Sequence, residues 1–352
     1  MQLYFAVSEA DFLRADSLYR KMPPPRQDTM QYRLLHAYQT NDVGKQEEYY
    51  RAYQKNNDVN VARAGYGLLH DLENPQAARR FVELSQADNR TPEAKARGQV
   101  LLSDIEMEQG RMRAALERVR RTNVPYRTRI YTEYANTPLS RISREQLEAM
   151  RAEVLALDSV PDSKSDRPGD QLRPHIRLYR AAVLSCRTGD FAAAAQYAQR
   201  LRALETPAHW QESIALLATE IDAQIDIENG RPQEGLRKLD QHRNIIALDL
   251  VGPFSWGSTI PMWRAEALFR AQRYDEAAQW FDNLEDATYS DIPHVAYILL
   301  RKAQIADARN DSEKARDLYA RFLKLWNQPD PELQPVVDQA RNRLAALQAR
   351  VG

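Results

Sequence analysis

The chain of 352 residues has no formal net charge, because 49 lysine and arginine residues balance 49 aspartate and glutamate residues. A protein without a surplus of positive charge lacks the electrostatic attraction that dominates binding to nucleic acid, so DNA and RNA are disfavoured as direct partners. Hydrophobic residues make up 43% and charged residues 28% of the sequence, a mixture that supports a packed core and is typical of amphipathic helices.

No secretory signal or membrane anchor is readable at the beginning of the chain. The segment MQLYFAVSEADFLR lacks basic residues before its apolar part, and Glu9 and Asp11 interrupt that part. No later segment approaches the roughly 18 consecutive apolar residues of a spanning helix. The single cysteine, Cys186, cannot form an intrachain disulfide. We therefore expect a cytoplasmic protein with no membrane partner.

The first predicted element is an incomplete helical hairpin. Phe12, Ala15 and Tyr19 are spaced as on the second helix of such a hairpin, and LYFAVSEA before them is too short for a full first helix. Terminal repeats normally carry a polar capping face. We therefore expect either that Met1 belongs to a fragment of a longer protein or that an exposed seam permits self-association.

Three further hairpins are predicted in the N-terminal segment, 1–122. Their second helices carry Gln46, Ala77 and Ala115 at the position where two helices approach most closely, 31 to 38 residues apart. The hairpin with Gln46 is the weakest, because the other two have a small residue there. In LLSDIEMEQGRMRAALERV, Gly110 supplies the permissive backbone that ends the first helix.

The regular spacing is interrupted in the middle of the chain. The next small position after Ala115 is Ala194, 79 residues later, which is almost two periods. Residues 123–170 are therefore predicted to hold a degenerate hairpin or an inserted helix. Within them REQLEAMRAEVLALD is strongly helical and DSVPDSKSDRPGD reads as a loop.

Four hairpins are predicted in the C-terminal segment, 171–352. Ala194, Gly235, Ala277 and Ala315 mark their second helices, 41, 42 and 38 residues apart. Small side chains at these positions let two helix backbones approach closely. The last segment, PELQPVVDQARNRLAALQARVG, is expected to form a capping helix.

These small, aromatic and turn positions resemble the tetratricopeptide repeat family, whose period is about 34 residues. The resemblance implies an all-α fold: a right-handed superhelical solenoid of about eight antiparallel helix pairs. Separations near 40 depart from the family pattern and imply longer helices. Over about the last hundred residues, from VGPFSWGSTIPMW through QARNRLAAL, the chain is also similar to the C-terminal repeats of some bacterial serine/threonine kinases and winged-helix transcription regulators, especially in the stretch ending FLKLWNQPDPEL. This similarity implies a signalling context.

Catalytic and cofactor motifs are absent from the sequence. It contains no kinase glycine loop, HRD, DFG, GxGxxG, GxxxxGK[ST] or GxSxG motif, and the six histidines never approach the spacing of metal ligands. Cys186 lies beside apolar neighbours, where a free cysteine usually behaves as a small core residue. We expect no enzymatic activity, no metal and no cofactor.

The expected binding surface is the concave face, which first helices line in a solenoid of this type. Mixed charge on this face favours a polar peptide or one of mixed charge as the ligand. The alternative is that these side chains are simply exposed to solvent and have no role in binding. The helical phase points the following side chains toward this face: Tyr179, Glu220, Gln224, Glu266, Arg270 and Gln304.

An aromatic pair on a loop adds two candidates. Phe254 and Trp256 lie in VGPFSWGS, where Gly252, Pro253 and Gly257 break the helical pattern, and a loop aromatic pair can anchor a partner. The competing interpretation is that both rings fill a gap between long helices.

Two functions are compatible with these features. The first hypothesis is a non-catalytic scaffold, or a regulatory module, that binds a peptide or protein on its concave face. The alternative is the small-ligand sensor segment of a larger bacterial signalling protein, a kinase or a transcription regulator, with a pocket formed by residues 123–170.

Overall fold

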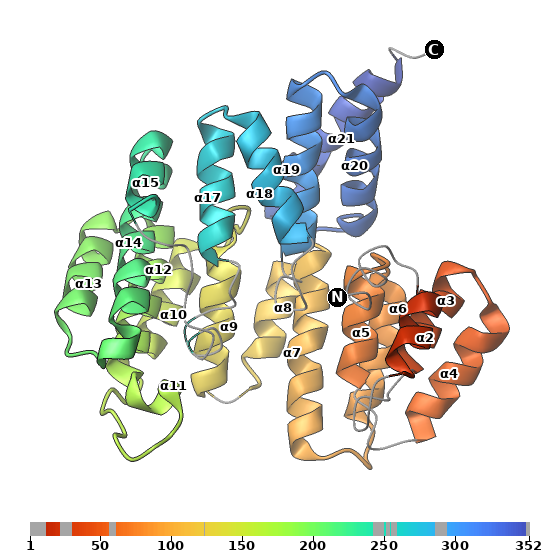
Figure 1. Ribbon diagram of the computed structural model, residues 1–352, viewed down its shortest axis with the longest axis horizontal. Helices are drawn as coiled ribbons and strands as arrows, with labels where there is room; N and C mark the ends of the chain where they lie inside the picture. Colours follow the sequence, from red (N-terminus) through yellow and green to blue (C-terminus); the bar gives the residue numbers. More distant parts are fainter. Residues whose placement is uncertain are drawn as a thin grey trace. The chain divides into compact units, whose positions relative to one another are not determined.

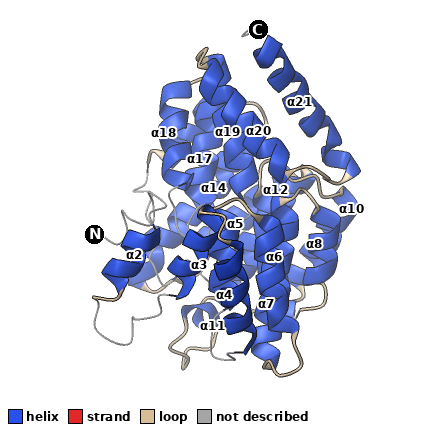
Figure 2. Cartoon of the chain, turned by 90° about the vertical axis from the view of Figure 1, so that its right-hand side faces the viewer, coloured by secondary structure: helices blue, strands red, loops and turns tan. Residues whose placement is uncertain are grey.

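The chain folds into helices only, within the residues that the structure describes (Figure 2). The prediction of an all-α fold is confirmed. No helix of this part is both long and apolar enough to cross a bilayer. The chain divides into two compact units, residues 1–119 and 120–352, and each is described by itself. The computed structural model describes residues 12–21, 30–55, 61–122, 124–241, 250, 254, 259–285 and 294–349.

The N-terminal unit is a series of helices in which most consecutive members pack against each other, while α5 packs more against α3 than against α4 (Figure 1, red to orange). Ala15 is fully buried, as expected of a small residue at a helix seam. The predicted incomplete first helix, and with it the proposed self-association, lies outside the described residues. The helices are α2 (Phe12–Tyr19), α3 (Met30–Gln39), α4 (Val43–Lys55), α5 (Val61–His70), α6 (Pro75–Glu83), η1 (Leu84–Gln86), α7 (Pro92–Glu108) and α8 (Met112–Val119).

The C-terminal unit, taken by itself, is also built of helices that pack in pairs, and it contains the segment predicted as an irregular insert. That segment forms a helix pair of its own, because α9 and α10 pack against each other and against α12. The helix α10 was predicted, whereas α9 was not. The helices are α9 (Val124–Asn136), α10 (Arg144–Leu155), α11 (Pro168–Gln171), α12 (Arg173–Thr188), α13 (Phe191–Ala203), η2 (Ala208–Trp210), α14 (Gln211–Glu228), α15 (Pro232–Leu239), α17 (Thr259–Arg270), α18 (Tyr274–Glu285), α19 (Val295–Ala308), α20 (Ser312–Leu325), η4 (Pro331–Leu333) and α21 (Gln334–Ala349).

The turns inside the helix pairs share one backbone geometry. In seven described pairs, one residue just after the first helix is left-handed, with φ between 47° and 78°. The next amide then donates to a carbonyl of the last helical turn, as from Asp190 N to Ser185 O at 3.0 Å, which satisfies a helix-end acceptor. The left-handed residues are Asn41, Glu73, Gly110, Gly189, Gly230, Gln272 and Asn310.

The small positions predicted on the second helices lie at close helix contacts. Ala115, Ala194, Ala277 and Ala315 are all fully buried. Gly235 has no room for a side chain, since a Cβ there would lie 3.0 Å from the backbone oxygen of Ala223. These predictions are confirmed.

The polar residue at one of these positions has its own structural reason. Gln46 is half-buried on α4, and its Nε2 donates to the backbone oxygen of Ala37 at 3.1 Å. The amide therefore satisfies a carbonyl near the end of α3, a function that alanine cannot perform.

Replacing Gln272 by glycine is expected to raise the free energy of unfolding by about 0.5 to 1 kcal/mol. The reason is that Gln272 has φ 59°, a conformation that costs a residue with a side chain roughly 1 to 2 kcal/mol, part of which the greater unfolded-state entropy of glycine cancels. Urea denaturation measures the change.

The reverse substitution at an equivalent turn is the control. Gly189 has φ 78°, and no atom lies within 4 Å of a Cβ built there, so Gly189→Ala adds backbone strain without a clash. Loss of stability in Gly189→Ala together with a gain in Gln272→Gly is expected, and two changes of the same sign would contradict the explanation.

Candidate functional site

Four first helices of the C-terminal unit, α12, α14, α17 and α19, bring their polar side chains together. We call these side chains the first-helix polar row. Two glutamates, Glu220 on α14 and Glu266 on α17, are fully buried within it. The members of the row are Tyr179, Arg187, Glu220, Gln224, Glu228, Glu266, Arg270, Tyr297, Arg301 and Gln304.

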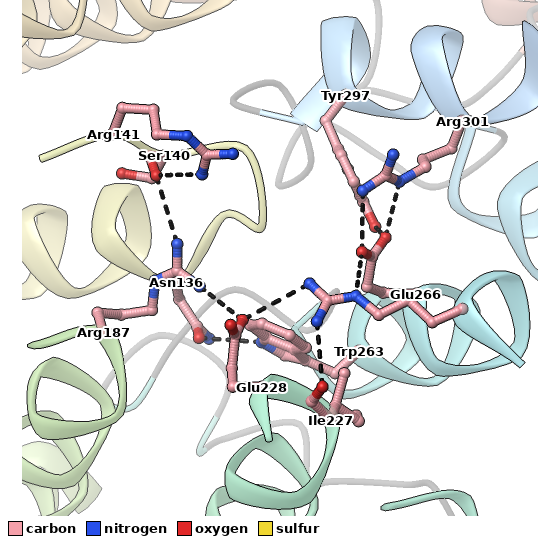
Figure 3. A network of polar contacts seen from close by, with 11 residues as sticks. Asn136, Ser140, Arg141, Arg187, Ile227, Glu228, Trp263, Glu266, Tyr297 and Arg301 are labelled. Atoms are coloured by element: carbon pink, nitrogen blue, oxygen red, sulfur yellow. Dashed lines mark hydrogen bonds and ion pairs between the residues drawn. The ribbon is translucent and has the colours of Figure 1, made fainter. Parts of the chain in front are cut away.

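Glu266 is a buried carboxylate with a full set of partners (Figure 3). Arg301 donates to both of its oxygens, at 2.8 and 2.9 Å, and Arg270 Nε donates at 2.8 Å. The hydroxyl of Tyr297 adds a hydrogen bond of 2.7 Å. Burial alone would raise the pKa of Glu266, but the attraction of Arg301 and Arg270 outweighs it, so this pKa is lowered. Glu266 is therefore ionised and joins α17 to α19.

Glu220 lies equally deep but has no cationic partner among the residues that the structure describes. Tyr179 Oη donates to its Oε2 at 3.1 Å, and Gln224 Nε2 donates to its Oε1 at 3.0 Å. Burial raises the pKa of Glu220 to about 7, against opposing hydrogen bonds from Tyr179, Asn136, Gln224 and Thr259. The two buried glutamates therefore differ in charge at pH values between about 4.5 and about 7, where Glu266 is ionised and Glu220 mostly keeps its proton.

A third carboxylate lies at the solvent-accessible part of the row (Figure 3). Arg187 Nη1 donates to Glu228 Oε1 at 2.8 Å, and Arg270 Nη2 approaches the same oxygen at 3.7 Å. The side chains of Arg187, Glu228 and Arg270 are 10%, 23% and 30% exposed. Arg270 also donates to the backbone oxygen of Ile227 at 3.1 Å. This end of the row presents charged groups that a ligand can reach.

The end of α9 contacts helices far along the sequence. Trp263 Nε1 on α17 donates to Asn136 Oδ1 at 3.0 Å, and Thr137 Oγ1 lies 3.3 Å from His294 Nδ1, just before α19 (Figure 3 shows the first pair). Arg187 Nη2 donates to the backbone oxygen of Ser140 at 3.4 Å. The end of α9 and the turn after it therefore pack against α12, α17 and the residue before α19. Sequence reasoning missed these residues, because no local pattern links positions more than 100 residues apart.

The sequence-based prediction that the row lies on an open face is wrong for four residues. Tyr179, Glu220, Gln224 and Glu266 have no exposed surface, so they cannot contact a partner directly. These side chains share one side of their helices, as the helical phase predicted, but neighbouring helices cover that side. These four residues position others and join the helices.

The other two candidates on the row remain accessible. Arg270 is 30% exposed, and Gln304 is half-buried with its Oε1 accepting from Arg301 Nη1 at 2.7 Å. Sequence reasoning missed Arg187, Glu228 and Arg301. Arg270, in contrast, was predicted, and it follows Glu266 by four residues, which is the spacing of ion pairs along a helix.

The loop aromatic Phe254 does not serve as an exposed anchor. It is 1% exposed, and its ring centroid lies 5.8 Å from that of Tyr179 in an edge-to-face arrangement. It belongs to the core cluster formed by α12, α13 and α14. The prediction that Phe254 anchors a partner is therefore wrong. Burial of a large aromatic ring is favourable, so the ring packs into the core although Phe254 lies on a loop. Trp256, the other candidate, lies outside the described residues.

In the described part of the chain, the side chains that could react or bind a metal ion are not arranged for either role. Cys186 is buried on α12, and this burial raises the pKa of its thiol far above the ordinary value, which makes it unreactive. Among the described residues, no three histidine, cysteine, aspartate or glutamate side chains are grouped so that they could hold a metal ion.

A groove of about 520 Å³ lies at the C-terminal end of the unit, between α19, α20 and α21. Leu300, Val336 and Ala340 contribute apolar surface to the groove. Gln304, a member of the first-helix polar row, also lines it. The charges of Asp307 and Arg343, which also line it, neutralise each other in an ion pair.

Comparison with known proteins adds no relative to this description. No protein-family model matches the chain, and no curated protein matches its sequence.

Proposed function

We propose that the chain is a non-catalytic, tetratricopeptide-like helical solenoid that binds a peptide or protein partner along the first-helix polar row. The observation that carries this proposal is the row of charged and amide groups on successive first helices, part of which is exposed. Arg187, Glu228, Arg270 and Gln304 offer donors and acceptors side by side on α12, α14, α17 and α19.

The surroundings of these groups favour a rigid recognition surface. Glu266 holds Arg270 and Arg301 in place through hydrogen bonds of 2.8 to 2.9 Å, so their guanidinium groups lose little freedom when a ligand binds. Donors from arginine and acceptors from glutamate match a polar peptide of mixed charge. This proposal includes a cytoplasmic location. It also includes a role in bacterial signalling, which is the context that the C-terminal resemblance implies.

Binding of a small molecule is the second candidate. The groove between α19, α20 and α21 has a volume of about 520 Å³, within the range of small-molecule sites. A ligand there would contact both Gln304 and the final helix, and thereby influence the end of the solenoid. In this case the chain would act as the sensor segment of a larger signalling protein.

Site-specific photo-crosslinking tests the leading proposal. A photo-reactive benzoylphenylalanine replaces Gln304 on α19 in one variant and Gln279, an exposed glutamine on the second helix α18, in the control. After illumination in the source cells, the variant at Gln304 is expected to form a discrete protein adduct that the variant at Gln279 does not form.

Two other outcomes contradict the proposal. Identical adducts from both positions would indicate non-specific contact, and the absence of an adduct at Gln304 would shift the function to the small-molecule candidate. Mass spectrometry of the intact protein under non-denaturing conditions then detects a bound small molecule directly.

A further inference from the structure

Two guanidinium groups at the accessible end of the row approach one carboxylate, and a third shares a backbone acceptor with one of them. We call Arg141, Arg187 and Arg270 the arginine cluster. Arg187 and Arg270 both approach Glu228 Oε1, at 2.8 and 3.7 Å. Arg141 and Arg187 both donate to the backbone oxygen of Ser140, at 3.1 and 3.4 Å. Arg187 on α12 therefore lies between two further cations, Arg141 from the turn after α9 and Arg270 from α17 (Figure 3 labels Arg141 and Arg187).

Arg187 lies in the field of two further cations. Burial lowers the pKa of Arg187, and the like charges of Arg141 and Arg270 lower it further, while Glu228 opposes them. Glu266, the other nearby acid, is already engaged by two hydrogen bonds from Arg301. An additional negative charge at this place would relieve the repulsion.

Arg187 and Arg270 also have unused donors. A guanidinium group carries five N–H donors. Arg187 uses one hydrogen bond to Glu228 and one to Ser140, and Arg270 uses one to Glu266 and one to Ile227. The side chains of Arg187 and Arg270 are 10% and 30% exposed and Arg141 is exposed, so part of the cluster faces solvent.

We infer that the arginine cluster binds the dianion of a phosphate monoester, carried either by a peptide or by a small molecule. A phosphate monoester has three equivalent oxygens that point in different directions, which suits donors arriving from three separate elements. A carboxylate is planar and carries a single charge, so it matches this arrangement less well. Glu228 occupies part of the site in the free protein and competes with the ligand. This inference rests on the proposed function and names the chemistry of the same surface.

Calorimetric titration tests the site with defined probes at constant ionic strength. The probes are inorganic phosphate, O-phosphoserine and a short phosphoserine peptide, with acetate as the carboxylate control. Phosphate and O-phosphoserine are expected to bind measurably, and acetate at least about tenfold more weakly. A phosphopeptide that binds about tenfold more tightly than O-phosphoserine identifies a peptide source, whereas equal affinities identify a small molecule.

Three single substitutions decide whether the cluster is the site. Arg141→Gln is expected to weaken phosphate binding about tenfold, and Glu228→Gln to strengthen it about tenfold because the internal competitor loses its charge. Arg144→Gln is the matched control, since Arg144 is an exposed arginine near Arg141 that pairs with Glu148 at 2.8 Å. It is expected to change nothing.

The opposite results would overturn the inference. Equal effects of Arg141→Gln and Arg144→Gln would show general attraction to positive charge, and weaker binding in Glu228→Gln would show that Glu228 supports the ligand. Circular dichroism confirms that each variant is folded. Photo-crosslinking at Gln304 in the Arg141→Gln variant separates the two proposals: an adduct that persists while phosphate binding is lost leaves the protein-binding function intact.

Discussion

Replacing Glu266 with glutamine is expected to lower the free energy of unfolding by about 3 to 5 kcal/mol at pH 7. The substitution leaves Arg301, whose side chain is only 13% exposed, without its carboxylate, and it removes the acceptor of Arg270 Nε as well. A buried charge without a counter-charge is among the costliest defects in a protein interior. Urea denaturation followed by circular dichroism measures the change.

The pH dependence gives this prediction a second readout. The pKa of Glu266 is lowered by folding, so its contribution is present above the unfolded-state value of 4.5 and is lost as the pH falls through the folded-state pKa. The difference between the Glu266→Gln variant and the unmodified protein should therefore shrink in acid. Glu276→Gln, which removes an exposed ion pair with Arg273, is the control and should have little effect. A comparable loss in both variants would contradict the explanation.

The same substitution at Glu220 is expected to have the opposite effect at pH 8, where it should raise the free energy of unfolding by about 2 to 3 kcal/mol. Folding raises the pKa of Glu220 from 4.5 to about 7, so the folded state binds more protons than the unfolded state between these values. Stability therefore falls as the pH rises through this window, by about 1.4 kcal/mol for each pH unit. Glutamine cannot ionise and escapes this loss.

The hydrogen bonds around Glu220 allow the substitution. An introduced amide can still accept from Tyr179 Oη, and once the Gln224 amide rotates by about half a turn it can donate to Gln224 Oε1, a buried oxygen that accepts no hydrogen bond from the described residues. The measurement is the free energy of unfolding at pH 5 and pH 8. The two proteins should differ little at pH 5 and clearly at pH 8. An equal fall in stability between these pH values in both proteins would show that Glu220 is not the titrating group.

The contrast between these glutamates was only partly visible in the sequence. Glu266 is followed after four residues by Arg270 and Glu220 by Gln224, so the local difference in charge was readable. The main partner of Glu266, however, is Arg301 on another helix, and the two lie 35 residues apart. Which of the two glutamates keeps its proton depends on that contact.

The sequence by itself determined the helices and the way they pair. The small residues at Ala115, Ala194, Ala277 and Ala315 and the turn residues such as Gly189 and Asn310 act over a few positions along the chain, and their spacing therefore predicts helix pairs correctly. The pair in residues 123–170 was recognised only in its second helix, because the residues that follow α9, TPLSRIS, include no glycine or asparagine for a left-handed turn.

The tertiary structure alone decided which polar residues are accessible. Helical phase predicts that Glu220 and Glu266 point to the same side as Arg270, but burial on that side depends on what packs there. The hydrogen bond between Trp263 and Asn136, 127 residues apart, and the contact of Thr137 with His294 bring the end of α9 against this side. Such contacts depend on how successive helix pairs rotate relative to one another, a small angle that accumulates over many residues and that no local sequence pattern specifies.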